Sequence, residues 1–447
     1  MLITSAEIDG GCTNIRIRGR MIVEIQKGLS ARGDEAVIDA GGCAVIPGLH
    51  DHHIHLNATA AARSSIQCGP PAIQNADQLA AALHNAPGAE WIRGVGYHQS
   101  VAGEIDRAWL DVHGPDRPIR IQHRSGRLWI VNSLALSRLG TAAPKDGRLL
   151  DSDPCIAKAL GVFPPDLAPV VSDLLSWGVT GVTDTTHTSQ LKDASTLADR
   201  TGPLRLLAMG DASMDAAFAG NSLIGPRKFH FHDHDLPALD ELVKSVRAAH
   251  LCGRPAAFHC VTLAELMLAL AALEDAGAIN GDRIEHGAMA SDAAMIWMAQ
   301  MGVPVVTQLG FLNERLPAYE TDVPSTDKTM LWRHQGYLNH EVALAAGSDS
   351  PFGDLNPWKA MARAVKRPVG FGVDEALAPE DALAGYLKPA EDVSSDPRRL
   401  CVGAPADIAI LDRNWETSKQ DLSLVQIAHT ILDGLIAYSK MSSTNPH

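Results

Sequence analysis

Short apolar runs that end at or beside a potential metal ligand recur along this 447-residue chain and alternate with helical patterns. The runs PAAFH, RIEHG and ALAAGSD bring His259, His286 and Asp349, respectively. The segments before the first two runs, ELVKSVRAAHLCG and LAELMLALAALEDAG, are typical of helices that stop at a glycine. Because buried strands and helices alternate, we expect a parallel sheet. Catalytic groups of a parallel barrel lie at the carboxyl ends of its strands.

A fourth run, PGLHDHHIHL at residues 47–56, contains His53 and His55 two positions apart. In an extended strand, residues i and i+2 point to the same face, so both imidazoles would line whatever that face encloses. Two adjacent imidazoles make half of a divalent-metal site. Taken alone, the window also fits a loop with scattered histidines. The three ligands downstream favour the metal site.

The order of these groups, H-x-H followed by His, His and Asp, resembles that of the amidohydrolase superfamily, metal-dependent hydrolases built on a distorted (β/α)8 barrel. The resemblance covers nearly the whole chain and points to the subgroup called amidohydrolase family 3. Five segments in the family's order are similar to its motifs: PGLHDHHIHL (first strand), RLWIVNSLAL at 127–136, GVTDTT at 181–186 (third strand), GSDSP at 347–351 with NPW at 356–358 (eighth strand), and GAPADIAILD at 403–412.

The resemblance implies an α/β fold with a TIM-like barrel over residues 47–394 and a small β-sandwich domain built from both chain ends, residues 1–46 and 395–447. Strand-like segments agree with this at the start (NIRIRG, MIVEI) and at the end (DIAILD, HTILDGLIAYS). The length suits one large barrel plus a smaller module. Residues 57–130 and 311–340 lack clear periodicity, and we expect loops there that cover the open end of the barrel.

Composition limits the partners and the cellular compartment. A net charge of −14 argues against nucleic acid or an anionic membrane, since both favour clustered Lys and Arg. No apolar run approaches the roughly 18 residues of a membrane span, and the start shows no secretory signal. Seven cysteines without a CxxC pair indicate reduced thiols. We therefore expect a cytoplasmic protein with a small-molecule substrate; association into a homo-oligomer stays open.

The resemblance implies that His53, His55 and Asp349 hold a divalent ion, with zinc as the expected metal. Zinc lowers the pKa of a bound water toward ~7 and supplies hydroxide at neutral pH. By resemblance, Asp349 also takes the proton from the attacking water and passes it to the leaving group. His259 and His286 are implied ligands of a second ion. With one ion only, His259 would complete the first site and His286 would polarise the substrate carbonyl.

The fourth barrel strand departs from the family pattern. In RKFHFHDHD, Lys228, His230, His232 and His234 share one parity, so a strand would turn all four to one side. Family members with two metals often carry a carboxylated lysine that bridges both ions, and Lys228 matches that position. The family pattern K-x-x-x-D-G has Asp where this chain has His232. Lys228 is the expected bridging ligand, with a solvent-facing lysine as the alternative, and His230 and His232 are candidates for lining the substrate pocket.

Two residues of the region 57–130 are weaker candidates for substrate binding. Arg127 stands where the subgroup usually has a His, and it could pair with a carboxylate of the substrate or of the protein. An exposed surface position is the alternative. His98, in GYHQS, is the second candidate.

The resemblance predicts hydrolysis of a C–N bond in an amide, a cyclic amide or an N-acyl compound. Deamination or dechlorination of a heteroaromatic ring, and hydrolysis of a lactone or ester, are alternatives on the same site. Deaminase relatives usually carry a Glu three residues after the fifth-strand His, whereas this chain has Thr262 there and Glu265 further on. A non-enzymatic scaffold that has lost its ligands is disfavoured, because all the ligand positions are present.

Overall fold

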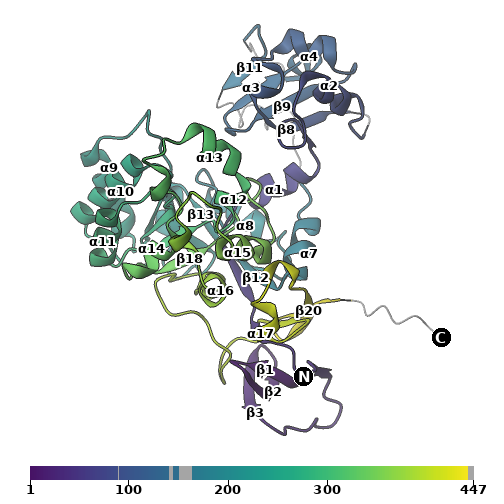
Figure 1. The fold of residues 1–447 in the computed structure, drawn as a ribbon, viewed down its shortest axis with the longest axis vertical. Coiled ribbons are helices and arrows are strands. Elements are labelled where there is room, and N and C mark those ends of the chain that lie inside the picture. Colours follow the sequence, from purple (N-terminus) through teal and green to yellow (C-terminus); the bar gives the residue numbers. More distant parts are fainter. Residues whose placement is uncertain (89, 140–143, 151–163, 441–447) are drawn as a thin grey trace, which may run out of the picture. The chain divides into compact units, whose positions relative to one another are not determined.

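The computed structural model describes residues 1–88, 90–139, 144–150 and 164–440 (Figure 1). The chain divides into two compact units. The smaller unit is Asn57–Asp166, and the larger one combines Met1–Leu56 with Leu167–His447.

Eight parallel strands form the central sheet of the larger unit, and each pairs with the next along the chain. Hydrogen bonds from Asp349 N to His53 O (2.6 Å) and from His55 N to Ser350 O (3.0 Å) join the segment after the last strand to the first. The predicted TIM-like α/β barrel is therefore confirmed. Its strands are β6 (Leu49–Ile54), β12 (Val179–Asp184), β13 (Arg205–Gly210), β14 (Ile224–Phe229), β15 (Ala256–Cys260), β16 (Arg283–His286), β17 (Val305–Thr307) and β18 (Leu344–Ala346).

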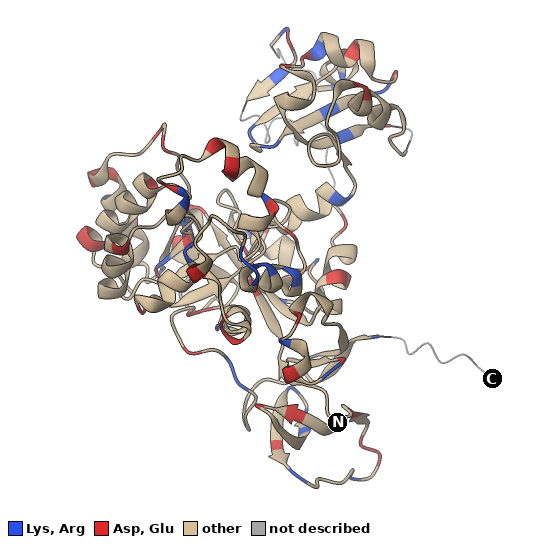
Figure 2. Ribbon diagram, in the orientation of Figure 1, with Lys and Arg blue, Asp and Glu red and all other residues tan. Residues whose placement is uncertain are grey.

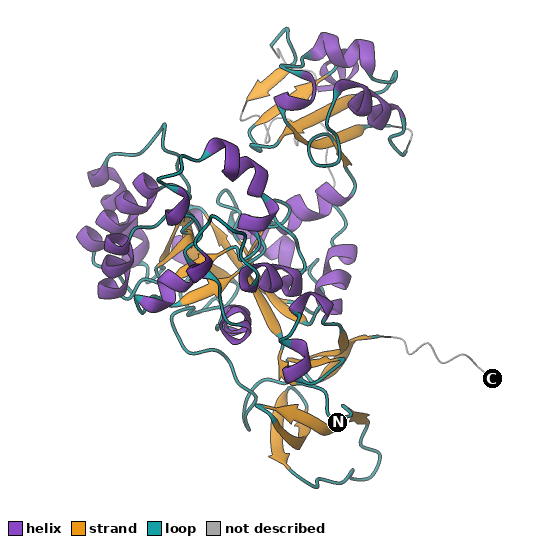
Figure 3. Cartoon of the chain, in the orientation of Figure 1, coloured by secondary structure: helices purple, strands orange, loops and turns teal. Residues whose placement is uncertain are grey.

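Helices pack around this sheet (Figure 3). The helices predicted before PAAFH and RIEHG are confirmed as α9 (Leu239–Leu251) and α10 (Leu263–Ala276). A capping box of Thr262 and Glu265 starts α10, because each side chain accepts a hydrogen bond from backbone N–H groups of the first turn. The other helices of the barrel are α7 (Ala168–Ser176), α8 (Leu191–Ala198), α11 (Asp292–Met301), α12 (Phe311–Glu314), α13 (Leu316–Asp322), α14 (His334–Asn339), α15 (Pro357–Val365) and α16 (Pro379–Leu387), with 3-10 turns η1 (Ala212–Ala217), η2 (Lys328–Met330) and η3 (Val373–Glu375).

Both chain ends form four-stranded sheets, in the orders β3-β2-β1-β4 and β21-β20-β19-β5. One buried cluster joins the two sheets, with Ile3 and Ile15 from the first and Ile408 and Ile431 from the second. The ends thus meet as the resemblance implied, while the exact domain boundaries stay a prediction. The elements are β1 (Leu2–Ile8), β2 (Gly11–Arg18), β3 (Met21–Gln26), β4 (Val37–Asp39), β5 (Val45–Pro47), β19 (Ile408–Leu411), α17 (Trp415–Ser418), η4 (Leu422–Leu424), β20 (Ile427–Leu432) and β21 (Leu435–Ser439).

The prediction of loops for residues 57–130 is wrong. This region belongs to the smaller unit, which has its own five-stranded sheet, β11-β10-β9-β8-β7, and its own core around Leu79, Leu83 and Ile121. Its strands range from two residues in β7 to six in β8, and the burial along β8 does not alternate regularly. The elements are α1 (Leu56–Arg63), β7 (Ile66–Gln67), α2 (Ala76–His84), β8 (Ile92–Tyr97), α3 (Gln99–Ala102), α4 (Arg107–His113), β9 (Ile119–His123), β10 (Leu128–Val131), α5 (Ser133–Leu139) and β11 (Arg148–Leu150).

Two further expectations need correction. Residues 311–340 are largely the short helices α12, α13 and α14 rather than open loop, and each of these is too brief to show helical periodicity. The segment GVTDTT is the second barrel strand, β12, and not the third, because the strands between β6 and β12 belong to the smaller unit. The third barrel strand is β13.

Acidic and basic residues are spread over the helices and loops of both units (Figure 2). Within the described ranges, no helix is both long and apolar enough to cross a membrane. Six cysteines carry free thiols, and Cys155 lies outside the described residues. The cytoplasmic location stays a prediction.

Candidate active site

The predicted ligands lie at the carboxyl ends of barrel strands. His53 lies on β6, with His55 directly after that strand. His259 is on β15 and His286 is the last residue of β16. Asp349 follows the eighth strand, β18. Since these ends share one face of a parallel barrel, side chains far apart in the sequence meet there.

The carboxylate of Asp349 lies between the two imidazoles of the H-x-H pair. Its Oδ1 is 3.4 Å from Nε2 of His53 and 3.3 Å from Nε2 of His55. Two ligand atoms at zinc–ligand distances from one tetrahedral ion are about 3.3 Å apart. His53, His286 and Asp349 also offer ligand atoms that all lie within 4.8 Å of one another. These separations fit a shared divalent ion.

Glu285 orients the imidazole of His53. The carboxylate is fully buried and forms a short hydrogen bond with Nδ1 of His53 through Oε2, while Oε1 accepts one from Nε of Arg283 at 2.7 Å. Burial raises the pKa of Glu285, but Arg283, Lys228 and His53 outweigh it and hold the pKa well below its ordinary value. A carboxylate on Nδ1 leaves Nε2 with its lone pair toward Asp349, as metal-binding histidines require.

Sequence analysis missed Glu285, although it stands in the same RIEHG run as His286. In a regular strand these neighbours would point to opposite faces. The left-handed backbone at His286, with φ 68°, breaks the alternation, so that both residues contribute to one site. Asp349 also has a left-handed backbone, with φ 51°. Non-glycine residues rarely adopt this conformation, and such strain is common at functional sites.

Lys228 is buried near the end of β14, with 7% of its surface exposed, so the solvent-facing alternative is wrong. Its Nζ lies 3.9 Å from Oε2 of Glu285 and has no hydrogen-bond partner among the described residues. Burial lowers the pKa of this amine. A buried amine that has a carboxylate 3.9 Å away but no hydrogen-bond partner among the described residues fits a site that is completed by another group.

His259 links this cluster to a second group of imidazoles. Its Nδ1 is 2.9 Å from Nε2 of His286, and its ring centroid is 4.4 Å from that of His230. Burial lowers the pKa of His286 to about 3 and that of His259 well below its ordinary value. Both rings are therefore neutral at pH 7, which is the form that binds a metal. His230, His232 and His259 also offer ligand atoms within 4.8 Å of one another.

His98 and Arg127 belong to the smaller unit, and their contact with substrate stays a prediction. His98 caps α3, where its Nδ1 accepts a hydrogen bond from Ser100 N and lies 2.8 Å from Ser100 Oγ. Arg127 lies between β9 and β10.

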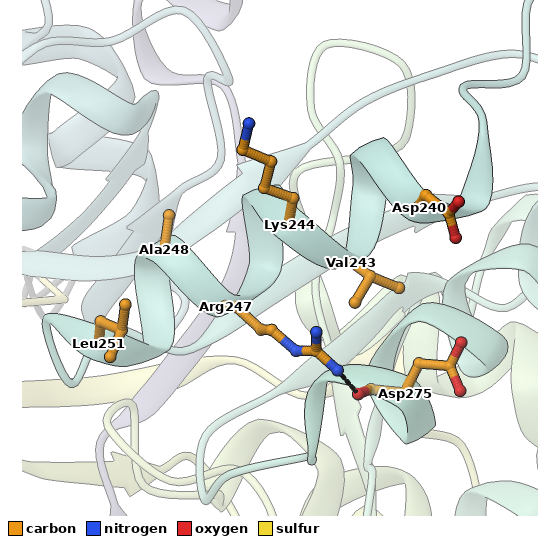
Figure 4. A pocket seen from close by; sticks show the side chains of 7 residues that line it. All are labelled: Asp240, Val243, Lys244, Arg247, Ala248, Leu251 and Asp275. Carbon is orange, nitrogen blue, oxygen red and sulfur yellow. Dashed lines mark hydrogen bonds between the residues drawn. The ribbon is translucent and has the colours of Figure 1, made fainter.

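A separate depression of about 620 Å³ lies on the outer helices of the barrel (Figure 4). Arg247 of α9 donates a hydrogen bond there to the backbone oxygen of Asp275 in α10. None of the predicted ligands lines it. Its lining residues are Asp240, Val243, Lys244, Arg247, Ala248, Leu251 and Asp275.

Known proteins are similar to this chain in sequence or in fold. N-substituted formamide deformylase of Arthrobacter pascens is 24% identical, over 93% of this chain and 92% of the relative. A metal-dependent hydrolase from Pyrococcus furiosus superimposes with a TM-score of 0.70 at 17% identity, over 91% of this chain and 97% of that one. Atrazine chlorohydrolase from Arthrobacter aurescens TC1, complexed with zinc, superimposes with a TM-score of 0.61 at 13% identity, over 98% and 95%.

The sequence profile of the amidohydrolase family matches residues 36–153 and 172–438. This match spans most of the chain and includes every predicted ligand from His53 to Asp349. The chain belongs to the amidohydrolase family.

Proposed function

We propose that this amidohydrolase hydrolyses a C–N bond of a small amide, cyclic amide or N-acyl compound at a divalent metal centre, with zinc as the expected ion. The observation that carries the proposal is the placement of Asp349 Oδ1 3.3–3.4 Å from two imidazole nitrogens at the barrel strand ends. The formamide deformylase among the relatives supports C–N chemistry. The zinc complex of the chlorohydrolase supports the choice of metal.

The ligands in this proposal are His53, His55, Lys228, His259, His286 and Asp349. A divalent ion bound by them lowers the pKa of a coordinated water toward ~7 and polarises a carbonyl oxygen. The protein supplies the proton transfers. Burial raises the pKa of Asp349, but His53, His55 and His286 outweigh it and hold the pKa below its ordinary value. Asp349 is thus ionised at neutral pH and able to take a proton from water and deliver it to the leaving nitrogen.

His286 is better suited to bind a metal than to donate a hydrogen bond to the substrate. Its Nδ1 lies 2.7 Å from Oε1 of Gln308, which places the ring proton on Nδ1. A neutral ring with this tautomer keeps a lone pair on Nε2. The lone pair faces Nδ1 of His259 at 2.9 Å and can bind an ion in place of that contact, but it cannot polarise a carbonyl by donation. Of the two roles that the sequence left open for His286, this supports that of metal ligand.

The deaminase alternative lacks a free acid at the expected position. Thr262 caps α10, and the carboxylate of Glu265 accepts hydrogen bonds from Val261 N at 2.7 Å and Thr262 N at 3.1 Å. Both side chains are therefore engaged in starting the helix. Amide hydrolysis needs no acid beyond Asp349, which favours it over attack on an aromatic ring.

A substrate screen tests the proposed function. The zinc-loaded protein should release an amine from N-substituted formamides, N-acyl amino acids or aryl amides, or should open the ring of a cyclic imide at one C–N bond. Chelation should abolish turnover and added zinc should restore it. Turnover confined to lactones would contradict the proposal and support lactone or ester hydrolysis at the same site. Turnover confined to amino- or chloro-substituted heteroaromatic rings would support deamination or dechlorination instead.

Replacing Lys228 by Ala is expected to reduce bound metal by at least one ion per chain. The lowered pKa increases the fraction of neutral amine, and only this form reacts with CO2 to give the bridging carbamate. Metal analysis measures the loss, and added short-chain carboxylic acids should partly restore activity by replacing the carbamate. Lys244→Ala removes an exposed lysine of α9 and is the matched control. Unchanged metal content in Lys228→Ala would refute the carbamate bridge.

A further inference from the structure

The histidines after β14 gather beside His259 because of strand register. The parallel pairs Lys228–Ala257 and Phe229–Phe258 place His230 next to His259. The ring centroid of His232 is 4.7 Å from that of His230 and 6.0 Å from that of His259. These two histidines occupy the segment where the chain departs from the family's K-x-x-x-D-G pattern.

The backbone that carries His230 and His232 is anchored. Asp235 N donates a hydrogen bond to the carbonyl oxygen of His232 at 2.9 Å. Thr262 Oγ1, at the start of α10, donates one to Oδ1 of Asp233 at 2.5 Å. The two imidazoles therefore project from a loop that is tied both to itself and to the neighbouring βα connection.

The ring nitrogens of His230 and His232 form no hydrogen bond or ion pair within the part of the chain that the structure describes. His259 directs Nδ1 at His286, and its Nε2 likewise has no such partner there. His230 is exposed and the other two are half-buried, so solvent ions can reach the group. Their ligand atoms lie within 4.8 Å of one another, whereas ligand atoms of one tetrahedral ion are about 3.3 Å apart, so binding an ion requires these side chains to move closer together.

We propose that His230, His232 and His259 bind a divalent ion separate from the one at His53, His286 and Asp349. The inference rests on the proposed function and assigns its ligands more closely: His259 serves this ion, whereas His286 serves the first. Three imidazoles without a carboxylate select borderline transition metals such as zinc, cobalt, nickel or copper over magnesium or calcium. Nε2 of His259 is the nitrogen left for this ion, since Nδ1 faces His286. Three protein ligands leave a fourth position open to water or to a substrate atom.

Metal counting on the full-length protein tests this site. After zinc loading and removal of free metal, the double variant His230→Ala with His232→Ala should bind one ion fewer per chain than the wild type. In the cobalt-loaded proteins, the visible absorption of the wild type should exceed that of the variant by the contribution of one site. The matched control, His84→Ala with His113→Ala, removes two exposed histidines of the smaller unit and should retain the wild-type count. Equal counts and spectra in the two double variants would overturn the proposal.

A crystal of the zinc-loaded wild type tests the same site without any substitution. Anomalous density should lie about 2.0–2.1 Å from one ring nitrogen of each of His230, His232 and His259. Absence of that density, with zinc present at His53 and Asp349, would also overturn the proposal. Failure of the hydrolase function is seen separately, because the substrate screen measures turnover by the wild type, whereas the metal count and the anomalous density do not depend on turnover.

Discussion

The variant with His53→Ala and His55→Ala is expected to lose hydrolysis down to the uncatalysed background and to bind at least one ion fewer per chain. Both Nε2 atoms face Oδ1 of Asp349, at 3.4 and 3.3 Å, so the change removes two ligands from one ion. A divalent ion held by these histidines would lower the pKa of a bound water and so supply hydroxide at neutral pH, and the variant is therefore expected to lose the reaction rather than to slow it. Metal analysis after dialysis, together with kcat/KM on the substrate found by screening, measures both effects.

The histidine pair of the smaller unit again provides the control. His84→Ala with His113→Ala changes the same number of imidazoles at exposed positions and should retain metal and turnover. Circular dichroism establishes that the active-site variant is folded. A folded variant with full metal content and wild-type turnover would reject the site, and with it the proposed function.

The barrel and its ligand order could be predicted because their signals are local. Each strand-like run ends at or beside its ligand, and H-x-H spacing places two imidazoles on one face of a strand. The chain order of the runs then matches the order of the strands in the sheet, β6, β15, β16 and β18. Connections in such a barrel are sequential, so sequence order translates directly into spatial order.

The environment of Lys228 could not be predicted, because it depends on side chains from another strand. Its burial and its 3.9 Å approach to Glu285 follow from how β14, β15 and β16 pair. Glu285 itself has no distinguishing spacing relative to His53, which lies on the first strand. Only the closed barrel brings the two together.

The smaller unit was missed for a different reason. Its strands include β7 with two residues and β11 with three, and its core residues Leu79, Ile121 and Ile130 come from separate short elements. Periodicity over so few positions cannot be distinguished from loop sequence. The third-strand expectation for GVTDTT rests on resemblance to a family segment, whereas the sheet order places it in the second barrel strand, β12.

Replacing Asp349 by Asn should lower kcat at least ~100-fold, the usual contribution of a positioned general base. The amide keeps the shape of the carboxylate and an oxygen that can face the ion, but it cannot accept the proton of the attacking water. His53 and His55 remain, so much of the metal should stay bound. Because the pKa of Asp349 lies below its ordinary value, the wild type retains this base from about pH 5 to 8, and the loss should be similar across that range.

Asp240→Asn makes the same chemical change on an exposed carboxylate of α9 and should leave kcat unchanged. Metal content must be measured alongside the rate. If the Asp349→Asn protein has lost its ion, a low rate shows only that Asp349 is needed for metal binding and says nothing about proton transfer. The informative result is a metal-replete Asp349→Asn protein. If this protein turns over slowly, the carboxylate of Asp349 moves the proton. Turnover at the wild-type rate would mean that another group moves the proton. The nearest imidazoles would then be the residues to replace.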